Sequence, residues 1–560
     1  MRFAMVKMTG RKALFESLKL QGVEYIFGNP GTSESPIMHE LQFHPEFKYV
    51  LVFQEGVAIG MADAYSRATG KPAFVNLHIE TGLGNAVSLM HNAKEGGSQI
   101  VLSAGNLDVR EYDRGRTDLV EMVEQFTKFS GEASHPEQMF GLINRAFHEA
   151  ATPPTGPTFV SFSANSLDDE GNFEFFPPSP LPYENRPSVD TIGNAVNALK
   201  NAKHPVLVVG DRISQSSAWK EVVQLSNITG AAVYASSYSE MNFPNDHPNY
   251  KGEIRLGYPE GKQIMRQHDV VIGIGKLTTG YWMFSNPSPS FFDPKTKFIH
   301  IDVDSSNLGS YLKTDIPILS DPKTALSEIN DGLSEAVDGE YKESASLRSK
   351  QYSIDKLNAS ENWKTTLSQK RDNEPISAER LMSDAASVIP KGSIIVNDAV
   401  TSGNSLMNSF TFNEPGSIYG GRGGALGWGM GGALGVQLAN PDKKVIAFCG
   451  DGSALMTIQG LLTAAKENIP VTYVVCNNSI YRVLKVNMNF YRENILKVKD
   501  SNEQYLGMDF GRRIDIHTIA KGMNVNSWRI DNPKDIKPVL LEAINSNKPS
   551  LLDVTIDGTL

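Results

Sequence analysis

Two polar side chains with chemical potential follow short apolar runs in the last third of the sequence. The run VIAFC leads into Asp451, which lies between two glycines, and the run VTYVVC leads into Asn478. The two residues are 27 positions apart, about one strand–helix–strand crossover, so both are expected at the carboxyl ends of adjacent parallel strands. With a backbone carbonyl, that of Ile480, they form an oxygen ligand set suited to Mg²⁺ or Ca²⁺.

The residues next to this expected cation site favour an anion as its partner. Gly452 lets the backbone approach a phosphate closely. A helical pattern, SALMTIQGLLTAAKEN, begins near Ser453 and is expected to direct its free N–H groups at the same anion. The sequence therefore predicts a metal-bound diphosphate site.

This constellation resembles the thiamine diphosphate signature of the decarboxylase and acetolactate synthase superfamily. The resemblance implies that Asp451, Asn478 and the Ile480 carbonyl hold Mg²⁺ on the cofactor's diphosphate. Further cofactor contacts are implied for Gly452, Ser453, Asn478, Tyr481 and Thr401.

A family member must also supply a carboxylate to N1′ of the cofactor's aminopyrimidine ring. Glu55 begins the run E-G-x-A-x-G-M-A-x-x-Y-x-R-x-T-G-K-P, which resembles the family closely at a strand-to-helix turn. The resemblance assigns Glu55 this activating role. Because the family pairs this domain with the diphosphate domain of another subunit, it also implies a homodimer or homotetramer with the active site at the subunit interface.

The glycine-rich run GGRGGALGWGMGGALGVQLA lies between these two signatures. Gly427, Gly429 and Gly432 match G-x-G-x-x-G, but no clean strand precedes them and no acidic residue follows in a ribose-binding context, so we interpret the match as fortuitous. The family resemblance instead implies that the Gly424 carbonyl accepts from the aminopyrimidine and that Leu426 supports the bent cofactor from below.

Within the superfamily, the sequence is most similar to benzoylformate decarboxylase and its relatives. The similarity is strongest in IFGNPGTSESP, in 50–92 and in 420–484. It implies that Thr32 and His78 occupy the positions of a serine and a histidine that contact the substrate. Thr32 keeps the hydroxyl, and an imidazole at His78 can act as acid or base near neutral pH.

Other positions depart from the benzoylformate decarboxylase pattern. Trp282 stands where that family has a second catalytic histidine, and Asn487 stands at the aromatic pocket position. Arg482 replaces a small residue. Glu80 is a candidate replacement acid, although we favour its interpretation as a solvated charge. These departures favour a smaller or more polar substrate than benzoylformate.

Strands that alternate with helical patterns along the whole chain predict three doubly wound α/β domains with parallel sheets. A Pro-rich stretch at 175–187 and a polar stretch at 331–375 separate them; we interpret the latter as a solvated connector with room for a helix. We expect a pyrimidine-binding domain at 1–185, a central domain at 186–350 and a diphosphate-binding domain at 365–560.

Composition excludes several other classes of protein. The 560 residues carry a net charge of −10, which argues against a nucleic-acid partner. The two cysteines, Cys449 and Cys476, exclude a disulfide scaffold and end apolar runs as buried thiols would. No apolar run approaches the roughly 18 residues that a membrane span requires. We expect a cytoplasmic protein with no membrane partner.

The sequence thus predicts a thiamine diphosphate- and Mg²⁺-dependent enzyme that cleaves the C–C bond next to the carbonyl of a small-molecule 2-oxo acid, as a benzoylformate decarboxylase-like decarboxylase does. One alternative is an acetolactate synthase-type carboligase. Another is a lyase acting on 2-hydroxy ketones or 2-hydroxyacyl-CoA esters. A non-catalytic paralogue is disfavoured because Glu55, Asp451 and Asn478 are all intact.

Overall fold

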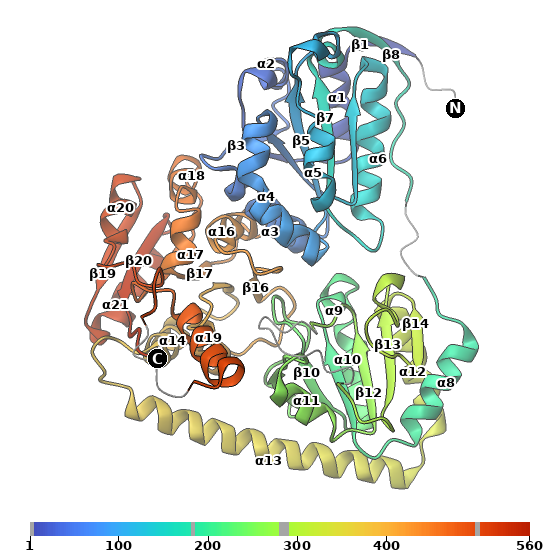
Figure 1. Ribbon diagram of the computed structural model, residues 1–560, viewed down its shortest axis with the longest axis vertical. Helices are drawn as coiled ribbons and strands as arrows, with labels where there is room; N and C mark the ends of the chain where they lie inside the picture. Colours follow the sequence, from blue (N-terminus) through green and yellow to red (C-terminus); the bar gives the residue numbers. More distant parts are fainter. Residues whose placement is uncertain (1–4, 181–184, 279–290, 499–503) are drawn as a thin grey trace.

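The computed structural model describes residues 5–180, 185–278, 291–498 and 504–560. The chain forms three α/β domains, each built on a six-stranded parallel sheet (Figure 1). The predicted fold class is therefore confirmed. No helix within the described ranges is long and apolar enough to cross a membrane.

The N-terminal domain has the strand order β3-β2-β4-β5-β7-β6, and a separate antiparallel pair, β1 and β8, lies beside it. Its strands are β1 Val6–Thr9, β2 Tyr25–Asn29, β3 Lys48–Leu51, β4 Ala73–Leu77, β5 Ile100–Asn106, β6 Phe129–Ala133, β7 Thr158–Ser163 and β8 Glu170–Phe173. Its α-helices are α1 Gly10–Leu20, α2 Ser35–Leu41, α3 Glu55–Thr69, α4 Ile79–Gly96, α5 Leu119–Val123, α6 Met139–Ala151 and α7 Ala164–Asp168. Strand order reverses between β2 and β4, and such a point opens a crevice at the carboxyl ends of the strands.

The C-terminal domain repeats this order as β16-β15-β17-β18-β20-β19. Its strands are β15 Ile394–Asp398, β16 Ile418–Gly420, β17 Val445–Gly450, β18 Thr472–Asn477, β19 Asn526–Ile530 and β20 Ser550–Thr555. Its α-helices are α14 Ala378–Val388, α15 Gly403–Ser409, α16 Trp428–Ala439, α17 Asp451–Met456, α18 Gly460–Glu467, α19 Arg482–Phe490, α20 Ile516–Gly522 and α21 Ile536–Asn545. The corresponding crevice opens between β15 and β17.

The central domain has a different order, β11-β10-β9-β12-β13-β14. Its strands are β9 Pro205–Val209, β10 Ala232–Ala235, β11 Tyr250–Glu253, β12 Val270–Ile274, β13 Lys297–Asp302 and β14 Ile316–Leu319. Its α-helices are α8 Val189–Lys200, α9 Arg212–Gln215, α10 Trp219–Thr229, α11 Pro259–Met265 and α12 Pro322–Ala336. Buried Val, Leu and Ile along β9 and β12 make this sheet a covered core layer.

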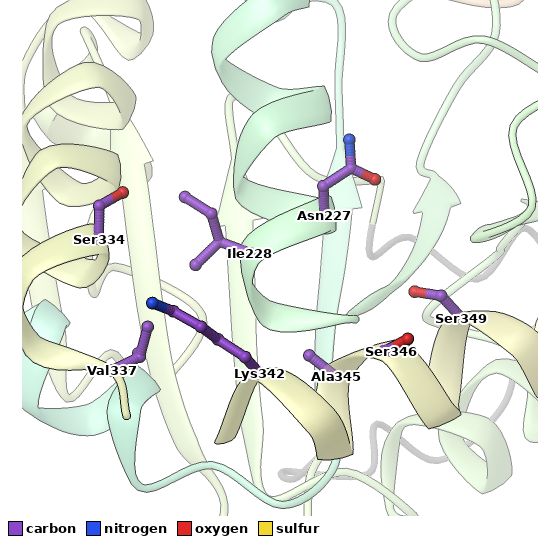
Figure 2. Close-up of a pocket in the computed structure, with 8 residues that line it drawn as sticks. All are labelled: Asn227, Ile228, Ser334, Val337, Lys342, Ala345, Ser346 and Ser349. Atoms are coloured by element: carbon purple, nitrogen blue, oxygen red, sulfur yellow. The ribbon is translucent and has the colours of Figure 1, made fainter. Parts of the chain in front are cut away.

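The predicted polar connector is mostly one long helix, α13, which spans Gly339–Gln369 and runs from the central to the C-terminal domain (Figure 1). Ala345 is its only buried residue. A cavity of about 410 Å³ lies where α13 leaves α10 and α12 (Figure 2). It is lined by Asn227, Ile228, Ser334, Val337, Lys342, Ala345, Ser346 and Ser349. Lys342 is the single ionisable side chain in this lining, so the cavity offers no acid–base pair for catalysis. The candidate active site therefore lies elsewhere.

Helices α3 and α16 hold the outer domains together through close backbone contact. Almost all of α3 is buried, and it ends at Gly70, whose φ of 70° is the left-handed cap that glycine favours. On α16, a Cβ at Gly431 would lie 2.6 Å from the Val57 oxygen, and one at Gly435 would lie 2.1 Å from the Met61 oxygen. Glycine is therefore required here by proximity, which explains the glycine-rich sequence of this helix.

Gly435→Ala is expected to lower the free energy of unfolding by about 1–3 kcal/mol, because the added methyl forces α16 away from α3. Gly193→Ala in α8 is the matched control, since nothing lies within 4 Å of the position its Cβ would take. That change should stabilise by about 0.5–1 kcal/mol through helix propensity. Urea unfolding of both variants checks the pair, and equal stabilisation would contradict the packing argument.

Candidate active site

Asp451 begins helix α17 directly after β17, and its carboxylate is buried. The Gly452 N–H donates to Oδ1 at 2.8 Å and the Ser479 N–H donates to Oδ2 at 2.6 Å. Burial raises the pKa of Asp451. No ion pair to Asp451 is present among the described residues, so a cation would satisfy a carboxylate that backbone N–H groups only partly stabilise.

Asn478 and Ile480 follow β18 on the neighbouring strand, as the spacing predicted. The Ile480 N–H donates to the Asn478 Oδ1 at 3.1 Å. A short antiparallel contact holds this loop, in which the Tyr481 N–H donates to the Met508 carbonyl and the Phe510 N–H to the Ser479 carbonyl. Neither bond uses the Ile480 carbonyl. The donor set therefore fits a divalent cation.

The surroundings of this loop allow only glycine at position 452. A Cβ there would lie 2.5 Å from the Tyr481 ring, which itself packs edge-on against Phe510. Within the described ranges, no three His, Cys, Asp or Glu side chains come together as a metal site. A cation here would accordingly rely on one carboxylate with amide and carbonyl oxygens.

Helix α17, which follows β17, is shorter and begins earlier than the sequence predicted. It begins at Asp451 rather than near Ser453 and ends at Met456, and α18 resumes at Gly460. The break falls at Thr457, whose hydroxyl donates to the Gly427 carbonyl at 2.5 Å instead of continuing the helix. This bond ties the end of α17 to the glycine-rich loop.

Ser453 joins the same region to a residue that sequence reasoning missed, Asp398 at the end of β15. The Ser453 hydroxyl donates to Asp398, and the Gly429 N–H donates to the same carboxylate at 2.9 Å. Burial raises the pKa of Asp398 to about 6. The signal was a strand, SIIVND, that ends in a carboxylate; only the strand order places it beside β17. Thr401 lies half-buried after Val400, whose φ is 41°.

The glycine-rich loop leaves β16, so a short strand does precede it and the expectation of none was wrong. Gly424 is exposed with a φ of 91°, and Leu426 is half-buried. Asn92 of α4, in the N-terminal domain, binds the loop through two hydrogen bonds. Its amide donates to the Ala425 carbonyl at 2.8 Å and accepts from the Ala425 N–H at 2.9 Å. The loop is thereby presented as a fixed backbone surface.

Glu55 begins α3, as predicted, and is buried. Gln54 caps the helix by accepting from the Val57 N–H at 3.2 Å. Two amides hold the carboxylate: Asn29 at the end of β2 donates to Oε1 at 3.0 Å, and Asn85 of α4 donates to Oε2 at 2.9 Å. These donors orient the carboxylate and leave acceptor capacity for a further partner.

His78 follows β4 and precedes Ile79, whose φ of 32° is strained for a β-branched residue. His78 Nδ1 lies 2.9 Å from the Glu34 Oε2 and 3.0 Å from the Ser33 Oγ. The predicted Thr32 is exposed, and the hydroxyl at His78 belongs to its neighbour Ser33. A Cβ at Gly31 would lie 2.1–2.3 Å from imidazole atoms, so the ring rests on that glycine.

Glu34, which sequence reasoning missed, is completely buried beneath this histidine. Its carboxylate also accepts from the Gly105 N–H at 2.7 Å, the Gly31 N–H at 2.9 Å and the Ser33 hydroxyl at 3.0 Å. A carboxylate that accepts all these bonds makes Nδ1 of His78 the protonated nitrogen. Nε2 is then the nitrogen available for proton transfer.

The remaining predicted positions have mixed outcomes. Trp282 lies outside the described residues. Arg482 begins α19, and its Nε donates to the Thr559 carbonyl at 2.8 Å; Asn487 lies on the same helix. One carboxylate oxygen of Glu80 is buried without a hydrogen-bond partner in the described part of the chain, so Glu80 is not a fully solvated charge.

The site residues thus form two groups, each at the point where strand order reverses. His78 and Glu34 follow β4 and β2, and Glu55, which follows the edge strand β3, contacts the end of β2 through Asn29. Asp451 and Asp398 lie by β17 and β15. This arrangement defines a three-domain architecture that offers buried carboxylates from one domain and a group of oxygen donors that fits a cation from another.

Comparison with known proteins identifies the class. Residues 8–126 match the thiamine pyrophosphate enzyme N-terminal TPP binding domain, 192–329 the central domain and 400–554 the C-terminal TPP binding domain. These matches cover most of the chain, which therefore belongs to the thiamine pyrophosphate (thiamine diphosphate) enzyme family.

Similar proteins lie in the decarboxylase and acetolactate synthase branch of that family. The chain is 25% identical to benzoylformate decarboxylase of Pseudomonas aeruginosa, over 98% of each sequence. It is 27% identical to a probable acetolactate synthase large subunit of Methanocaldococcus jannaschii, over 98% of this chain and 92% of the relative. The crystal structure of benzoylformate decarboxylase from Polynucleobacter necessarius shares the fold, with a TM-score of 0.85, 23% identity and 99% coverage of both chains.

Glu34→Gln is expected to lower the free energy of unfolding by about 1–3 kcal/mol, because an amide cannot accept from all four donors and leaves a buried group unpaired. Glu46→Gln is the control: Glu46 pairs with His44 at an exposed position, so its loss should change the free energy of unfolding much less than the loss of Glu34. Urea unfolding compares the two variants. Equal losses would contradict the role of the buried carboxylate.

Proposed function

We propose that the protein is a thiamine diphosphate- and Mg²⁺-dependent enzyme that cleaves the bond between the carbonyl and the carboxylate of a 2-oxo acid. The observation that carries this proposal is the oxygen donor set of the buried Asp451 and the half-buried Asn478 and Ile480, at the strand-order reversal of a thiamine pyrophosphate-binding domain. Thiamine diphosphate, when bound, supplies an electron sink for the electron pair that stays on the former carbonyl carbon when the carboxylate leaves as CO₂.

The C-terminal domain would hold the diphosphate end of the cofactor. Asp451 Oδ2, Asn478 Oδ1 and the Ile480 carbonyl would ligate Mg²⁺, whose preference for oxygen ligands they meet. The Gly452 and Ser453 backbone and the side chains of Thr401 and Tyr481 would contact the diphosphate. The exposed Gly424 carbonyl and Leu426 would contact the rings.

The N-terminal domain would supply the proton chemistry. Glu55, held by Asn29 and Asn85, would share a proton with the pyrimidine nitrogen, and its burial keeps water from competing for that bond. His78 would exchange protons with the substrate through Nε2, because Glu34 occupies Nδ1. Thr32 would offer its hydroxyl from the same loop to a substrate carboxylate, since the Ser33 hydroxyl already donates to Glu34.

We further propose that two copies assemble so that Glu55 of one copy meets the diphosphate site of the other. Phe53 beside Glu55, and Val400 and Met456 beside the cation site, are 43–49% exposed apolar side chains. Their burial in an interface would remove apolar surface from water around the proposed site. This assembly makes a homodimer the smallest active unit.

A carboligase of the acetolactate synthase type is the second candidate. Arg482 uses its Nε for the Thr559 carbonyl, and its other guanidinium nitrogens can bind a second carboxylate. Identity to the acetolactate synthase relative is as high as that to the decarboxylase. The polar residues on α19 favour a polar acceptor or donor over an aryl group.

A substrate panel tests the function. Protein stripped with a chelator should be inactive, and Mg²⁺ with thiamine diphosphate should restore CO₂ release from a small 2-oxo acid such as pyruvate faster than from benzoylformate. Product chromatography with and without an acceptor aldehyde separates decarboxylation from ligation. Full activity of metal-free protein, or no activity on any 2-oxo acid, would refute the proposal.

Glu55→Gln keeps the size of the side chain but cannot share a proton in the same way. Turnover should fall by about 10²-fold or more, as is typical for lost acid–base assistance, while cofactor binding persists. Steady-state rates and calorimetric titration of the cofactor measure the two effects. Glu16→Gln on α1 is the control, with turnover unchanged. Normal turnover of Glu55→Gln would exclude the activating role.

A further inference from the structure

Two buried arginines from different domains converge where all three domains meet. Arg67 on α3 and Arg422 after β16 both bind Glu240 Oε1 of the central domain, through Nε and Nη2 respectively, each at 2.7 Å. Arg422 Nε also lies 3.0 Å from Asp211 Oδ2. Both arginine side chains are at most 5% exposed. Asp63 completes this set, which we call the junction network.

Backbone groups join the same three domains around the junction network. Arg67 donates to the Gly420 carbonyl of the C-terminal domain and to the Ser239 carbonyl of the central domain, each at 2.9 Å. Arg422 donates to the Gly96 carbonyl of the N-terminal domain at 2.8 Å. The Gly420 N–H donates to the Ser239 carbonyl at 2.7 Å. The central domain thus pairs with the edge strand that leads into the glycine-rich loop.

The carboxylates of the junction network are satisfied in detail. Asp63 accepts from the Trp428 indole and the Ser98 hydroxyl, and Asp211 accepts from Ser239 and Asn242. Although burial acts to raise it, the pKa of Asp211 is lowered, chiefly by Arg422. Three carboxylates therefore surround two guanidinium groups, and removing one member leaves others buried without a partner.

The junction network ends directly at the loop that faces the cofactor rings. Gly423 and Gly424 follow Arg422 directly, and their φ values of 75° and 91° lie where glycine is free to move, so the contacts on either side must select this conformation. Asn92 fixes the far side through Ala425. The near side is fixed by Arg422, whose position depends on Glu240 and Asp211 of the central domain.

We propose that Glu240 and Asp211 are positioning residues that hold Arg422, and through it the Gly423–Gly424 backbone, in the conformation that receives the aminopyrimidine ring. The inference rests on the proposed cofactor site. It gives the central domain a role in cofactor affinity although none of its residues belongs to the proposed site. Asp451 is held by the Gly452 and Ser479 N–H groups, so binding of the diphosphate alone should not depend on the conformation of Gly423–Gly424.

For the experiment, the protein is first stripped of metal and then loaded with Mg²⁺. It is titrated by calorimetry with thiamine diphosphate and, in a separate run, with inorganic pyrophosphate. In Glu240→Gln, affinity for thiamine diphosphate should fall at least about tenfold, because the loop is no longer preorganised. Affinity for pyrophosphate should stay within about twofold of wild type. A change in neither affinity, or an equal fall in both, would overturn the positioning role.

Glu240→Asp is a second variant, in case Glu240→Gln does not fold. The aspartate keeps the negative charge, but its side chain is too short to reach both arginines. A cavity of about 340 Å³ lined in part by Arg67, Glu240 and Arg422 lets water reach the shortened side chain. The same selective loss is expected in this variant, and unaltered affinity for thiamine diphosphate would overturn the proposal.

Asp384→Asn is the matched control, because it breaks a comparably buried ion pair with Arg380 away from the loop. It should lower thermal stability without changing either affinity. A selective loss of thiamine diphosphate affinity in this control would overturn the assignment. If the wild-type protein binds pyrophosphate but no thiamine diphosphate, the proposed function itself fails. If the wild-type protein binds thiamine diphosphate and the Glu240 variants bind it equally well, only the positioning role fails.

Discussion

The burial of carboxylates is the constraint on which this structure depends. Glu34, Glu55, Asp398 and Asp451 are each withdrawn from water, and each is stabilised by a different set of donors. Backbone N–H groups bind Asp451 and Glu34, and side-chain amides bind Glu55. Because such donors must be fixed in place before they can offset desolvation, strand ends, helix starts and glycine turns are arranged around these four groups.

The shared strand order of the outer domains explains why the two halves of the proposed site are alike in position. In both sheets the crevice opens where the order reverses, and a helix begins directly after the strand on one side of it, α4 after β4 and α17 after β17. Parallel sheets place their free carbonyl edge and helix N-termini together at that point. The central sheet also reverses its order, between β9 and β12, but its strands follow a different sequence, and this domain contributes carboxylates to the ion pairs that join the other two.

The sequence predicted the contacts that a single crossover determines and missed those that need the order of strands. The placement of Asp451 and Asn478 on adjacent strands was predicted because one crossover fixes their separation, and Glu55 was singled out by the family resemblance of the run that it begins. Glu34 was missed since its partner Gly105 lies 71 positions away on β5. Asp398 was missed because nothing in the spacing showed that β15 lies beside β17. The break at Thr457 depends on a contact from another loop, which local helix propensity does not contain.

Helix α13 is one of two connections between the central and C-terminal domains. Its 31 residues span about 46 Å and bridge the central and C-terminal domains, which also meet at the buried arginines. The covalent connection and the non-covalent one are therefore redundant. A protease that cuts the exposed helix would yield two fragments that remain associated and migrate as one particle, separating only in denaturant.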